Sequence, residues 1–573
     1  MKMRLRVNKL DNNQGVAMVA ALVFTVVLIG IAEVFVLRAI HESKQARIER
    51  EQAMTFHSAQ GASELAIQQL DVLINDYLQN TILNSSPSGV ITYTNSKVNS
   101  GQGIEWLVFS VRNNNVPVLA QNGDQAEYSQ SGTVGNKNYT YSLIITEKED
   151  PHTSGSDAWD FPFNYRIEAT STSGSVVSNV ILLGDFTVQV LKDNFAKFAL
   201  FTNTQTMPSG TNVWFTDKTN FAGPVHTNDR FNFALNPSGT FEEVVTQHQQ
   251  TARFYNGGAN VLYDGNSYGT SDVPIFNDTF TRNVGSITLS AATQQSDMVT
   301  QAQGSGGGSF SSSGIYVPAQ GSDLSGGIYV NGDSTVNITV DASNNAVYTI
   351  TQGSTTKKIT VNQSAGSTTV ENLSTGAVSN YNGLPDGIDN AGTLIYVNGN
   401  ITGLQGTVQA DTQVTVASSD DMVISNHVQY SSYTPAVGTP GTVGYVPPNA
   451  DGATNMLGLV SWGGDVRVGT SAPNNVNVHG TVLAENGIFA VDSYNNYVVR
   501  GTATLLGGAI TNNYGAFGLF NGSTGQQVSG YGRNFVYDSR MQNGQAPPYF
   551  PTLDTFIAFT NDIADKIVWQ EGQ

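Results

Sequence analysis

The sequence predicts an α+β chain that becomes mainly β, with a long N-terminal helix, an antiparallel-sheet head and a C-terminal right-handed parallel β-helix. Three observations support this fold class. A 22-residue apolar run opens a proline-free helical stretch, residues 89–190 alternate in period two, and short apolar segments recur later at intervals of about 20 residues. Antiparallel strands give the same alternation, so β-sandwich domains are the alternative for the C-terminal part.

Composition and charge limit the function classes. The 573 residues exceed what one core requires, and 59 glycines with only 12% charged residues indicate a turn-rich, β-type surface. The net charge is -19, and because the first 50 residues carry +4, residues 51–573 carry -23. An acidic body repels phosphate backbones, which argues against nucleic-acid binding. The absence of cysteine excludes disulfides, thiolate catalysis and Cys-ligated metals.

The apolar run Val16–Leu37 is long enough to span a bilayer and contains one charge, Glu33. A cleaved secretory signal would have a shorter apolar region and a small-residue cleavage site after it, which VLRAIHESK does not offer. The run therefore predicts a single membrane-inserted helix, and the acidic, Asn/Thr/Gly-rich body is expected outside the inner membrane.

The leader MKMRLRVNKLDNNQG, residues 1–15, is short, basic and ends in Gly15 directly before the apolar run. It resembles the type IV prepilin signal, most closely that of pilus-assembly minor pilins related to PilX. The resemblance implies that a prepilin peptidase cuts after Gly15, and that Val16 becomes the first mature residue and is N-methylated. The alternative is an uncleaved signal-anchor in which Gly15 is incidental.

One departure from the pilin pattern concerns the fifth mature position. Major pilins usually carry a glutamate there, whereas this chain has Ala20. A buried carboxylate without a partner is costly, so a subunit with no neighbour above it does better without one, which favours a tip or initiating position. Glu33 is interpreted as a residue at the bilayer interface, with a buried pairing role as the alternative.

The predicted helix covers residues 16–83 and extends well beyond the membrane. Its later part places apolar residues at helical spacing, which predicts a stripe that packs on a sheet. The stripe consists of Ala59, Ala62, Ala66, Leu70, Leu73 and Tyr77. The segment between the membrane and this stripe is expected to form a stalk, and QAMTFHSAQGASELAIQQL again resembles the PilX-type segment.

Residues 84–193 are predicted to form a pilin-like β headgroup. Its strand candidates are GVITYT, EWLVFSV, YTYSLIITE, FNYRIEATS and SVVSNVILLGDFTVQV. Residues 194–300, with the strings NFAKFALFTNTQ and GPVHTN, resemble a domain of unknown function of bacterial pilin-like proteins. His226 in this segment is interpreted as a turn or core histidine, because no paired acid and serine surround it in a recognised motif.

After residue 300 the sequence predicts a Gly/Ser-rich loop, residues 301–325. The loop is followed by the predicted β-helix with its capping tail, residues 326–573. The clearest internal repeat is IYVNGD at 328–333 and IYVNGN at 395–400. The Pro/Gly/Tyr-rich segment 430–452 is predicted to be an exposed excursion whose tyrosines could serve recognition.

Candidate sites are few, and none carries an enzymatic motif. No organic cofactor is expected. Oxygen-rich segments could hold a structural calcium ion, although solvated loop carboxylates are the simpler interpretation and none follows the EF-hand spacing. These segments contain Glu147, Glu149, Asp150, Asp157 and Asp160, residues 264–272, and Asp386 with Asp389. Arg467, Arg500 and Arg533 are the bases that a glycan-processing β-helix could use, but no acid pair is repeated beside them.

The sequence therefore predicts a non-enzymatic minor type IV pilin or pilus-associated surface protein at the filament tip, for pilus assembly and adhesion. Its expected partners are other pilins, through the N-terminal helix, the prepilin peptidase and the inner membrane before assembly, with no nucleic acid. It is expected in the inner membrane as a single-pass protein and then in the pilus or on the cell surface. A membrane-anchored envelope glycan-binding or glycan-processing protein and a type II secretion pseudopilin are the alternatives.

Overall fold

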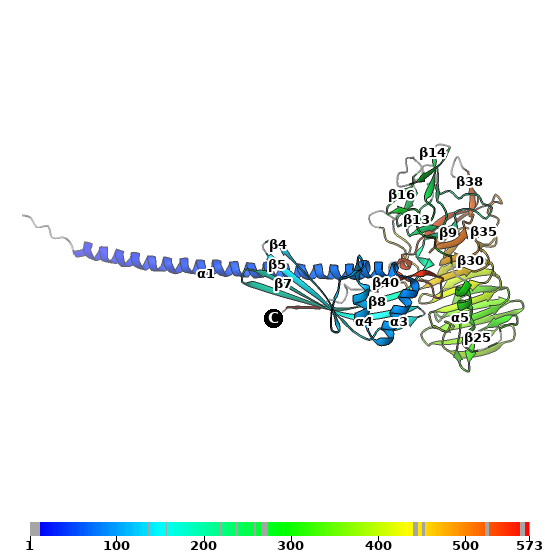
Figure 1. Cartoon of the computed structure of the whole chain (residues 1–573), viewed down its shortest axis with the longest axis horizontal. Helices are drawn as coiled ribbons and strands as arrows, with labels where there is room; N and C mark the ends of the chain where they lie inside the picture. The colour runs from blue at the N-terminus through cyan, green and yellow to red at the C-terminus, as the bar shows by residue number, and fades with distance from the viewer. Residues whose placement is uncertain are drawn as a thin grey trace, which may run out of the picture.

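The computed structural model describes residues 12–135, 137–155, 157–216, 219–234, 239–256, 259–264, 273–289, 292–306, 308, 310–438, 445–449, 453–521, 526–561 and 568–571. A long N-terminal helix leads to a β-rich head, and the head leads to a larger β-rich body at the far end (Figure 1). The two β-rich parts have separate hydrophobic cores, one in the head and one in the body.

The N-terminal helix runs without a break from residue 12 to residue 83. It consists of α1 (Asn12–Asp71), a π-helical segment η1 (Val72–Leu78) and α2 (Gln79–Leu83). Its second half lies on the head sheet, where α1 contacts β5, β7 and β8. Ala59, Ala66 and Leu70 are fully buried in this contact, as the helical spacing predicts.

The head sheet is antiparallel, in the order β3-β4-β5-β7-β8-β40, with β6 beside β7 and β41 beside β8. Its strands are β3 (Ala120–Asn122), β4 (Gln125–Val134), β5 (Lys137–Glu147), β6 (His152–Gly155), β7 (Ala158–Ser173), β8 (Val176–Asn194), β40 (Thr552–Asn561) and β41 (Val568–Glu571). A short hairpin, β1 (Arg112–Asn113) and β2 (Val116–Pro117), stands apart from it.

Two predicted strands of the head are wrong, because GVITYT and EWLVFSV lie in helices α3 (Pro87–Ser100) and α4 (Gly103–Ser110). Local capping explains the difference. The Ser86 side chain accepts a hydrogen bond from the Gly89 N–H, Pro87 occupies the first helical turn, and Gly101 ends α3 with a φ of 62°. These caps outweigh the β propensity of Val, Ile and Tyr in between. Both helices lie beside the head sheet (Figure 1).

The predicted capping tail, residues 530–553, lies largely in the body, where Tyr531, Phe550 and Leu553 are buried in the core, but the strands that follow it leave the body. β40 returns to the head and pairs antiparallel with β8, and β41 pairs with another part of β8. The chain therefore enters the body next to Phe195, whose N–H donates to the Pro551 carbonyl (3.1 Å), and leaves it at the same place.

The first sheet of the body has eleven strands and is parallel throughout except at one end, where β18 pairs antiparallel with β21. In spatial order its strands are β17 (Phe280–Thr281), β13 (Val245–Gln247), β10 (Val225–Thr227), β9 (Leu200–Thr204), β37 (Ala509–Asn513), β34 (Thr481–Ala484), β31 (Met456–Ser461), β29 (Gln413–Ser418), β27 (Thr393–Asn398), β21 (Ile328–Asn331) and β18 (Gly314–Tyr316).

The second sheet of the body has fifteen strands and faces the same core. In spatial order its strands are β19 (Ala319–Gln320), β20 (Asp323–Leu324), β26 (Ala377–Asn382), β25 (Ser367–Asn372), β24 (Thr355–Asn362), β23 (Ala346–Gln352), β22 (Ser334–Val340), β28 (Ile401–Val408), β30 (Met422–Tyr430), β33 (Asn477–His479), β36 (Val499–Leu506), β39 (Gln527–Val536) and β38 (Gly518–Phe520). In addition, β32 (Val466–Val468) pairs with β30, and β35 (Phe489–Val491) pairs with β32. Pairing is parallel from β22 to β39 through β28, β30, β33 and β36, and antiparallel in the hairpins β22–β26.

Smaller elements complete the body. They are η2 (Phe195–Lys197), β11 (Asn232–Phe233), β12 (Thr240–Phe241), β14 (Thr251–Asn256), β15 (Ala259–Asp264), β16 (Ile275–Phe276), α5 (Ala292–Gln303) and η3 (Ser539–Asn543). The predicted loop 301–325 thus holds the end of α5 and the short strands β18, β19 and β20. Helix α5 was not predicted from the sequence; its Met298 and Ala302 are buried in the body core.

The IYVNGD and IYVNGN repeats lie on neighbouring parallel strands in exact register, with Ile328 opposite Ile395. The rings of Tyr329 and Tyr396 stack with centroids 6.1 Å apart and an interplanar angle of 1°. At the following turn, Asp333 Oδ1 accepts hydrogen bonds from the backbone N–H (2.8 Å) and side-chain amide (3.0 Å) of Asn400. The repeat is therefore one unit of parallel stacking, in contrast to the antiparallel pairing of the β-sandwich alternative.

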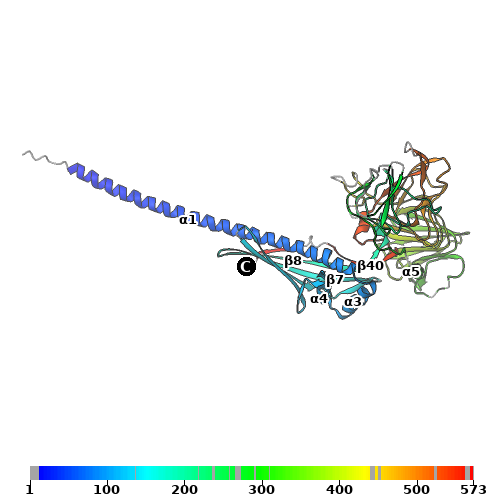
Figure 2. The ribbon, with the colours of Figure 1, turned by 45° about the horizontal axis from the view of Figure 1, so that its top comes forward.

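The stacking order does not follow the chain order. β9, from the start of the body, pairs in parallel with β37, from near its end, and β10, β13 and β17 continue the stack from there. The chain then returns through α5 to the opposite end of the stack and builds back towards β37. Asn203 and Asn512 bridge the two segments, because their side-chain amides are 2.9 Å apart. In Figure 2, as in Figure 1, the stacked body lies beyond the head at the end distant from the start of α1.

We expect Leu70→Ala to lower the free energy of unfolding of the head by about 2–5 kcal/mol, because Leu70 is fully buried between helix and sheet. Leu65→Ala in the same helix is the matched control, since Leu65 is 42% exposed, and should change stability by less than about 0.5 kcal/mol. Urea unfolding of the full chain in detergent, followed by the buried tryptophans Trp106 and Trp159, measures both. Equal effects of the two substitutions would show that the helix does not dock as described.

Candidate functional site

The N-terminal helix has two chemically different halves. Every residue from Gly15 to Arg50 is exposed, including the whole apolar run Val16–Leu37. Burial begins at Glu51 and Thr55, where the helix reaches the head sheet. By length and composition, this helix is the one in the described chain that could cross a membrane. Its apolar half thus has no partner among the described residues. Its burial in lipid or against other apolar helices would be strongly favourable.

The predicted processing residues Gly15 and Val16 both lie in α1, and the preceding residues 1–11 lie outside the described chain. A Cβ added to Gly15 would meet no atom within 4 Å, and glycine costs about 1 kcal/mol relative to alanine in a helix interior. Packing within the chain therefore gives no reason for a glycine at position 15. Ala20 and Glu33 lie on the same exposed half of the helix.

An ion pair fixes the helix where it first meets the head. Lys137 Nζ lies 3.0 Å from Glu51 Oε1, and the lysine side chain is only 5% exposed. The Ser173 hydroxyl donates to the same Glu51 oxygen, so the carboxylate joins the ends of two strands, β5 and β7. The hydrogen bond from Ser173, followed by that of Lys137, lowers the pKa of Glu51. This contact was not predicted from the sequence, because nothing local distinguishes Lys137 from a surface lysine.

His226 is a buried core histidine and not part of a catalytic set among the described residues. Its Nδ1 lies 2.8 Å from Thr246 Oγ1 and its Nε2 lies 3.0 Å from Asn228 Oδ1. Since an amide oxygen can only accept, Nε2 carries the proton and Nδ1 accepts from the threonine. The imidazole also stacks on the Phe201 ring at 5.2 Å. Burial lowers the pKa of His226 to about 4.

The excursion at 430–452, described at 430–438 and 445–449, is anchored by buried polar contacts. Tyr430, predicted to be available for recognition, is 5% exposed, and its hydroxyl accepts a hydrogen bond from the Leu457 N–H at 3.1 Å. The backbone N–H of Tyr430 donates to His479 Nδ1 at 3.2 Å. Thr434 and Asn449 close the base of the excursion through two hydrogen bonds of 3.0 and 3.2 Å. Tyr430 therefore serves packing and not recognition.

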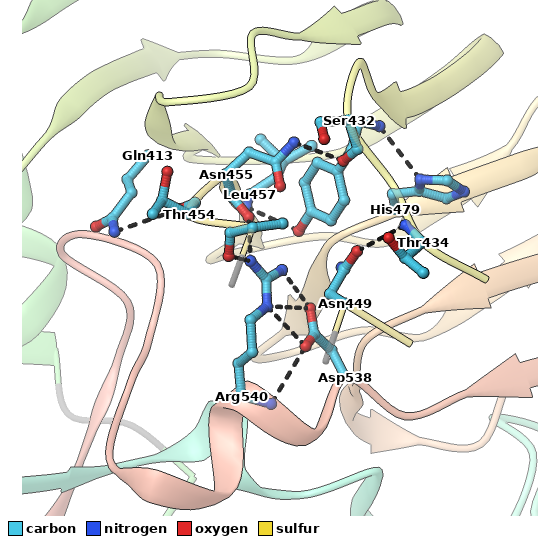
Figure 3. Close-up of polar contacts among 12 residues, drawn as sticks. Gln413, Ser432, Thr434, Asn449, Thr454, Asn455, Leu457, His479, Asp538 and Arg540 are labelled. Atoms are coloured by element: carbon cyan, nitrogen blue, oxygen red, sulfur yellow. Dashed lines mark hydrogen bonds and ion pairs between the residues drawn. The ribbon is translucent and has the colours of Figure 1, made fainter. Parts of the chain in front are cut away.

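Beneath the excursion lies a buried ion pair between Asp538 and Arg540 (Figure 3). The two side chains are 2% and 10% exposed, and Arg540 Nη2 is 2.5 Å from Asp538 Oδ2. Arg540 also donates to the carbonyls of Ala453 (2.6 Å) and Asn455 (2.8 Å). This arginine thus fixes the point where the excursion rejoins the stack.

The predicted cation ligands do not converge. Among the described residues, no group of three or more His, Asp or Glu side chains gathers as metal ligands. Glu147 instead accepts from the Ile104 N–H (2.7 Å), Asp157 pairs with Lys192 (2.8 Å) and Asp389 accepts from Gln301 (2.7 Å). Residues 265–272 lie outside the described chain.

The three arginines considered for glycan chemistry are engaged in internal contacts. Arg467 pairs with Asp421 at 2.6 Å and with Asp492 at 3.5 Å. The guanidinium carbons of Arg500 and Arg533 each lie 4.9 Å from the centroid of a tyrosine ring, Tyr531 and Tyr514 respectively. These contacts are those of residues that stabilise the stack.

Comparisons with known proteins add one domain match. The family model of DUF4900, a domain of unknown function, matches residues 160–249. This segment includes β7 and β8 of the head and β9, β10 and β13 of the body, so the match crosses the junction between them. No curated protein matches the chain.

Among solved structures, the competence-associated pilin ComZ from Thermus thermophilus is similar at 10% identity. The alignment covers 87% of this chain and 98% of that one, with a TM-score of 0.29. A likeness of this degree does not establish a shared fold.

The buried state of His226 predicts a pH dependence of stability. The pKa of His226 is lowered from 6.5 to about 4 on folding, so only the unfolded chain takes up this proton between pH 6.5 and 4. The contribution of neutral His226 to the free energy of unfolding is fully present above pH 6.5 and is lost as the pH falls towards 4. We expect the His226→Gln variant to lose less stability than the natural chain over this interval, as measured by urea unfolding at several pH values. Parallel stability curves would contradict the assignment.

The ion pair beneath the excursion gives a second expectation. Arg540→Met leaves the Asp538 carboxylate buried without its partner and should destabilise the body by about 3–5 kcal/mol. Replacing Asp538 by Leu as well should recover much of this loss. Arg467→Met is the matched control, because the Arg467–Asp421 pair is about one-third exposed and should contribute about 0–1 kcal/mol. Urea unfolding followed by the combined fluorescence of the five tryptophans distinguishes these outcomes, since one of them, Trp462, lies in the body core.

Proposed function

We propose that this chain is a non-enzymatic minor type IV pilin or pilus-associated surface protein that acts at the filament tip in pilus assembly and adhesion. The observation that carries the proposal is the division of the N-terminal helix into an exposed apolar half and a half buried on the head. The exposed half requires a membrane before assembly and the apolar helices of neighbouring subunits afterwards.

The energetics favour both environments for the exposed half. Its apolar side chains are about half to three-quarters exposed, for example Val16 at 69%, Phe24 at 66% and Leu37 at 66%. Burying one such side chain contributes about 1.5–3 kcal/mol. Transfer from the inner membrane to a bundle of pilin helices preserves this burial, so the same segment serves as single-pass anchor and as filament contact.

Processing at Gly15 by a prepilin peptidase follows from the same segment. Glycine at this position is not explained by packing within the chain, and it directly precedes the apolar run. Cleavage would make Val16 the new N-terminus, where methylation would follow. The alanine at position 20, in place of a carboxylate, suits a subunit without a neighbour above it.

A tip position is favoured by the size of the β-rich parts. The head and body are much broader than the helix that carries them (Figures 1 and 2). A closely packed shaft cannot accommodate such a subunit at every position, so we infer a low copy number. We interpret the body as a right-handed parallel β-helix, supported by the in-register repeats, and propose that it presents the adhesive surface.

The expected localisation is the inner membrane first and the pilus or cell surface afterwards. The partners are other pilins through α1 and the prepilin peptidase. The net charge of -19 argues against nucleic acid as a ligand. A type II secretion pseudopilin and an anchored envelope glycan protein share the same helix, and the experiment below distinguishes them from a pilus subunit.

The test is intact-mass and N-terminal mass spectrometry of the chain from sheared surface filaments and from membranes. We expect a low-abundance chain beginning at Val16 in the filament fraction. Gly15→Lys should block cleavage, so that the chain keeps residues 1–15 and stays in the membrane. Gly30→Ala is the matched control, because Gly30 lies in the same exposed helix and a Cβ there also meets no atom within 4 Å.

Three results would count against the proposal. A natural chain that retains residues 1–15 and is found only in membranes would indicate an anchored envelope protein. A processed chain that accumulates only together with components of a type II secretion machine would indicate a pseudopilin. Turnover of a polysaccharide by the full chain would favour the glycan-processing alternative.

A further inference from the structure

The strand β26 leaves a free edge in the fifteen-stranded sheet. On one side it pairs with β25 along its whole length, from Ala377 opposite Asn372 to Asn382 opposite Ser367. On the other side, within the described chain, β20 pairs with it only at Asn382. The segment Ala377–Tyr381 therefore has an outer edge that no described strand covers.

The direction in which the free backbone groups of β26 point follows from the hydrogen bond that Asn382 makes on this side. The Asn382 N–H donates outwards to the Ser322 carbonyl at 2.8 Å. Because backbone groups alternate along a strand, the N–H and C=O groups of Val378 and Asn380 point outwards too. These two residues offer four groups of the kind that pair with an added strand.

The edge lacks the features that usually prevent strand addition. Its sequence AVSNYN contains no charge and no proline. Val378 is 57% exposed, and Leu373 in the preceding turn is 48% exposed. Residues Ala377–Asn380 are exposed on both faces of the sheet, so the strand extends beyond the core that it adjoins.

The sequence of the edge is compatible with a second copy of itself. In an antiparallel pair centred on Ser379, Val378 lies opposite Asn380 of the second copy, and both residues have outward-pointing backbone groups. Ser379 then faces its own counterpart across a pair without hydrogen bonds, and Ala377 faces Tyr381. This register brings no like charges opposite each other. It also leaves Asn382 to β20, so the existing contact does not obstruct the approach.

The charged residues near this edge do not oppose the approach of a second copy. Two copies that each carry -19 repel one another. Around β26, however, the charged residues are nearly balanced, with Lys357 and Lys358 on β24 and Glu371 and Asp323 on β25 and β20. The edge is thus a place where two acidic chains can approach closely.

We propose that β26 is a self-association edge, through which two copies of this chain join their sheets by antiparallel pairing about Ser379. The contact involves one strand edge and is smaller than a permanent interface, so dimers should form in a concentration-dependent manner. The inference does not depend on the processing or position of the N-terminal helix.

The absence of cysteine from the chain makes the test direct. In the full chain with Ser379→Cys, purified in detergent, the two thiols should face each other across a pair whose Cα separation of about 4.5 Å lies within the range that a disulfide spans. We expect mild oxidation to give a covalent dimer on a non-reducing gel, increasing with protein concentration. Ser343→Cys is the matched control, because Ser343 is exposed in a turn of the same sheet and far from this edge, and should give little dimer.

A second variant tests the edge without new covalent chemistry. Ser379→Lys places two like charges opposite each other and should lower the dimer fraction in sedimentation velocity severalfold, with the unfolding midpoint unchanged. Equal crosslinking at positions 343 and 379, or none at 379, would overturn the proposal. Crosslinking of Ser379→Cys in native membranes to a polypeptide of different mass would show that another protein occupies the edge.

Discussion

The structure depends on one constraint: a single helix must pack on the folded head with one half and be buried in an apolar environment outside the head with the other half. The alanines at 59, 62 and 66 are small enough to bring the helix close to the sheet, and Leu70 and Leu73 complete the contact. Before Glu51, none of the residues that the structure describes covers the helix. The apolar run therefore decides where the protein can reside, while the buried stripe decides how the head and body are held relative to it.

The features that the sequence predicts well are those written in local patterns. The apolar stripe repeats at three and four residues, and its members are buried except Tyr77, which is partly buried. The IYVNG repeats share length, turn residues and alternation, and they occupy adjacent strands in register. In the stripe, the residues that carry the signal are near each other in the chain, so periodicity is enough to indicate their common face. In the repeats, the same short string recurs, which is enough to indicate equivalent positions in the fold.

The features that could not be predicted depend on capping or on distant partners. Val90 and Trp106 lie in helices although their neighbours favour strands, because Ser86 and Gly101 fix the ends of α3 and tertiary packing decides the rest. The pairing of β9 with β37 and of β40 with β8 joins segments about 300 residues or more apart. Lys137, Asp538 and Arg540 became recognisable as buried charges only once the fold had brought their partners to them. The candidate processing residues, in contrast, were located by sequence alone, since folding adds no contact to them.

The return of β40 to the head has a mechanical consequence. A body joined to its support by one connection would pass tension through a single peptide strand, whereas here residues 194–195 and 551–552 form two connections side by side. β8 and β40 run antiparallel next to each other, so a pull on the body loads both strands and stresses the hydrogen bonds between each strand and the rest of the sheet. The load is shared before it reaches the helix, which gives the attachment between body and head the character of a two-stranded tether.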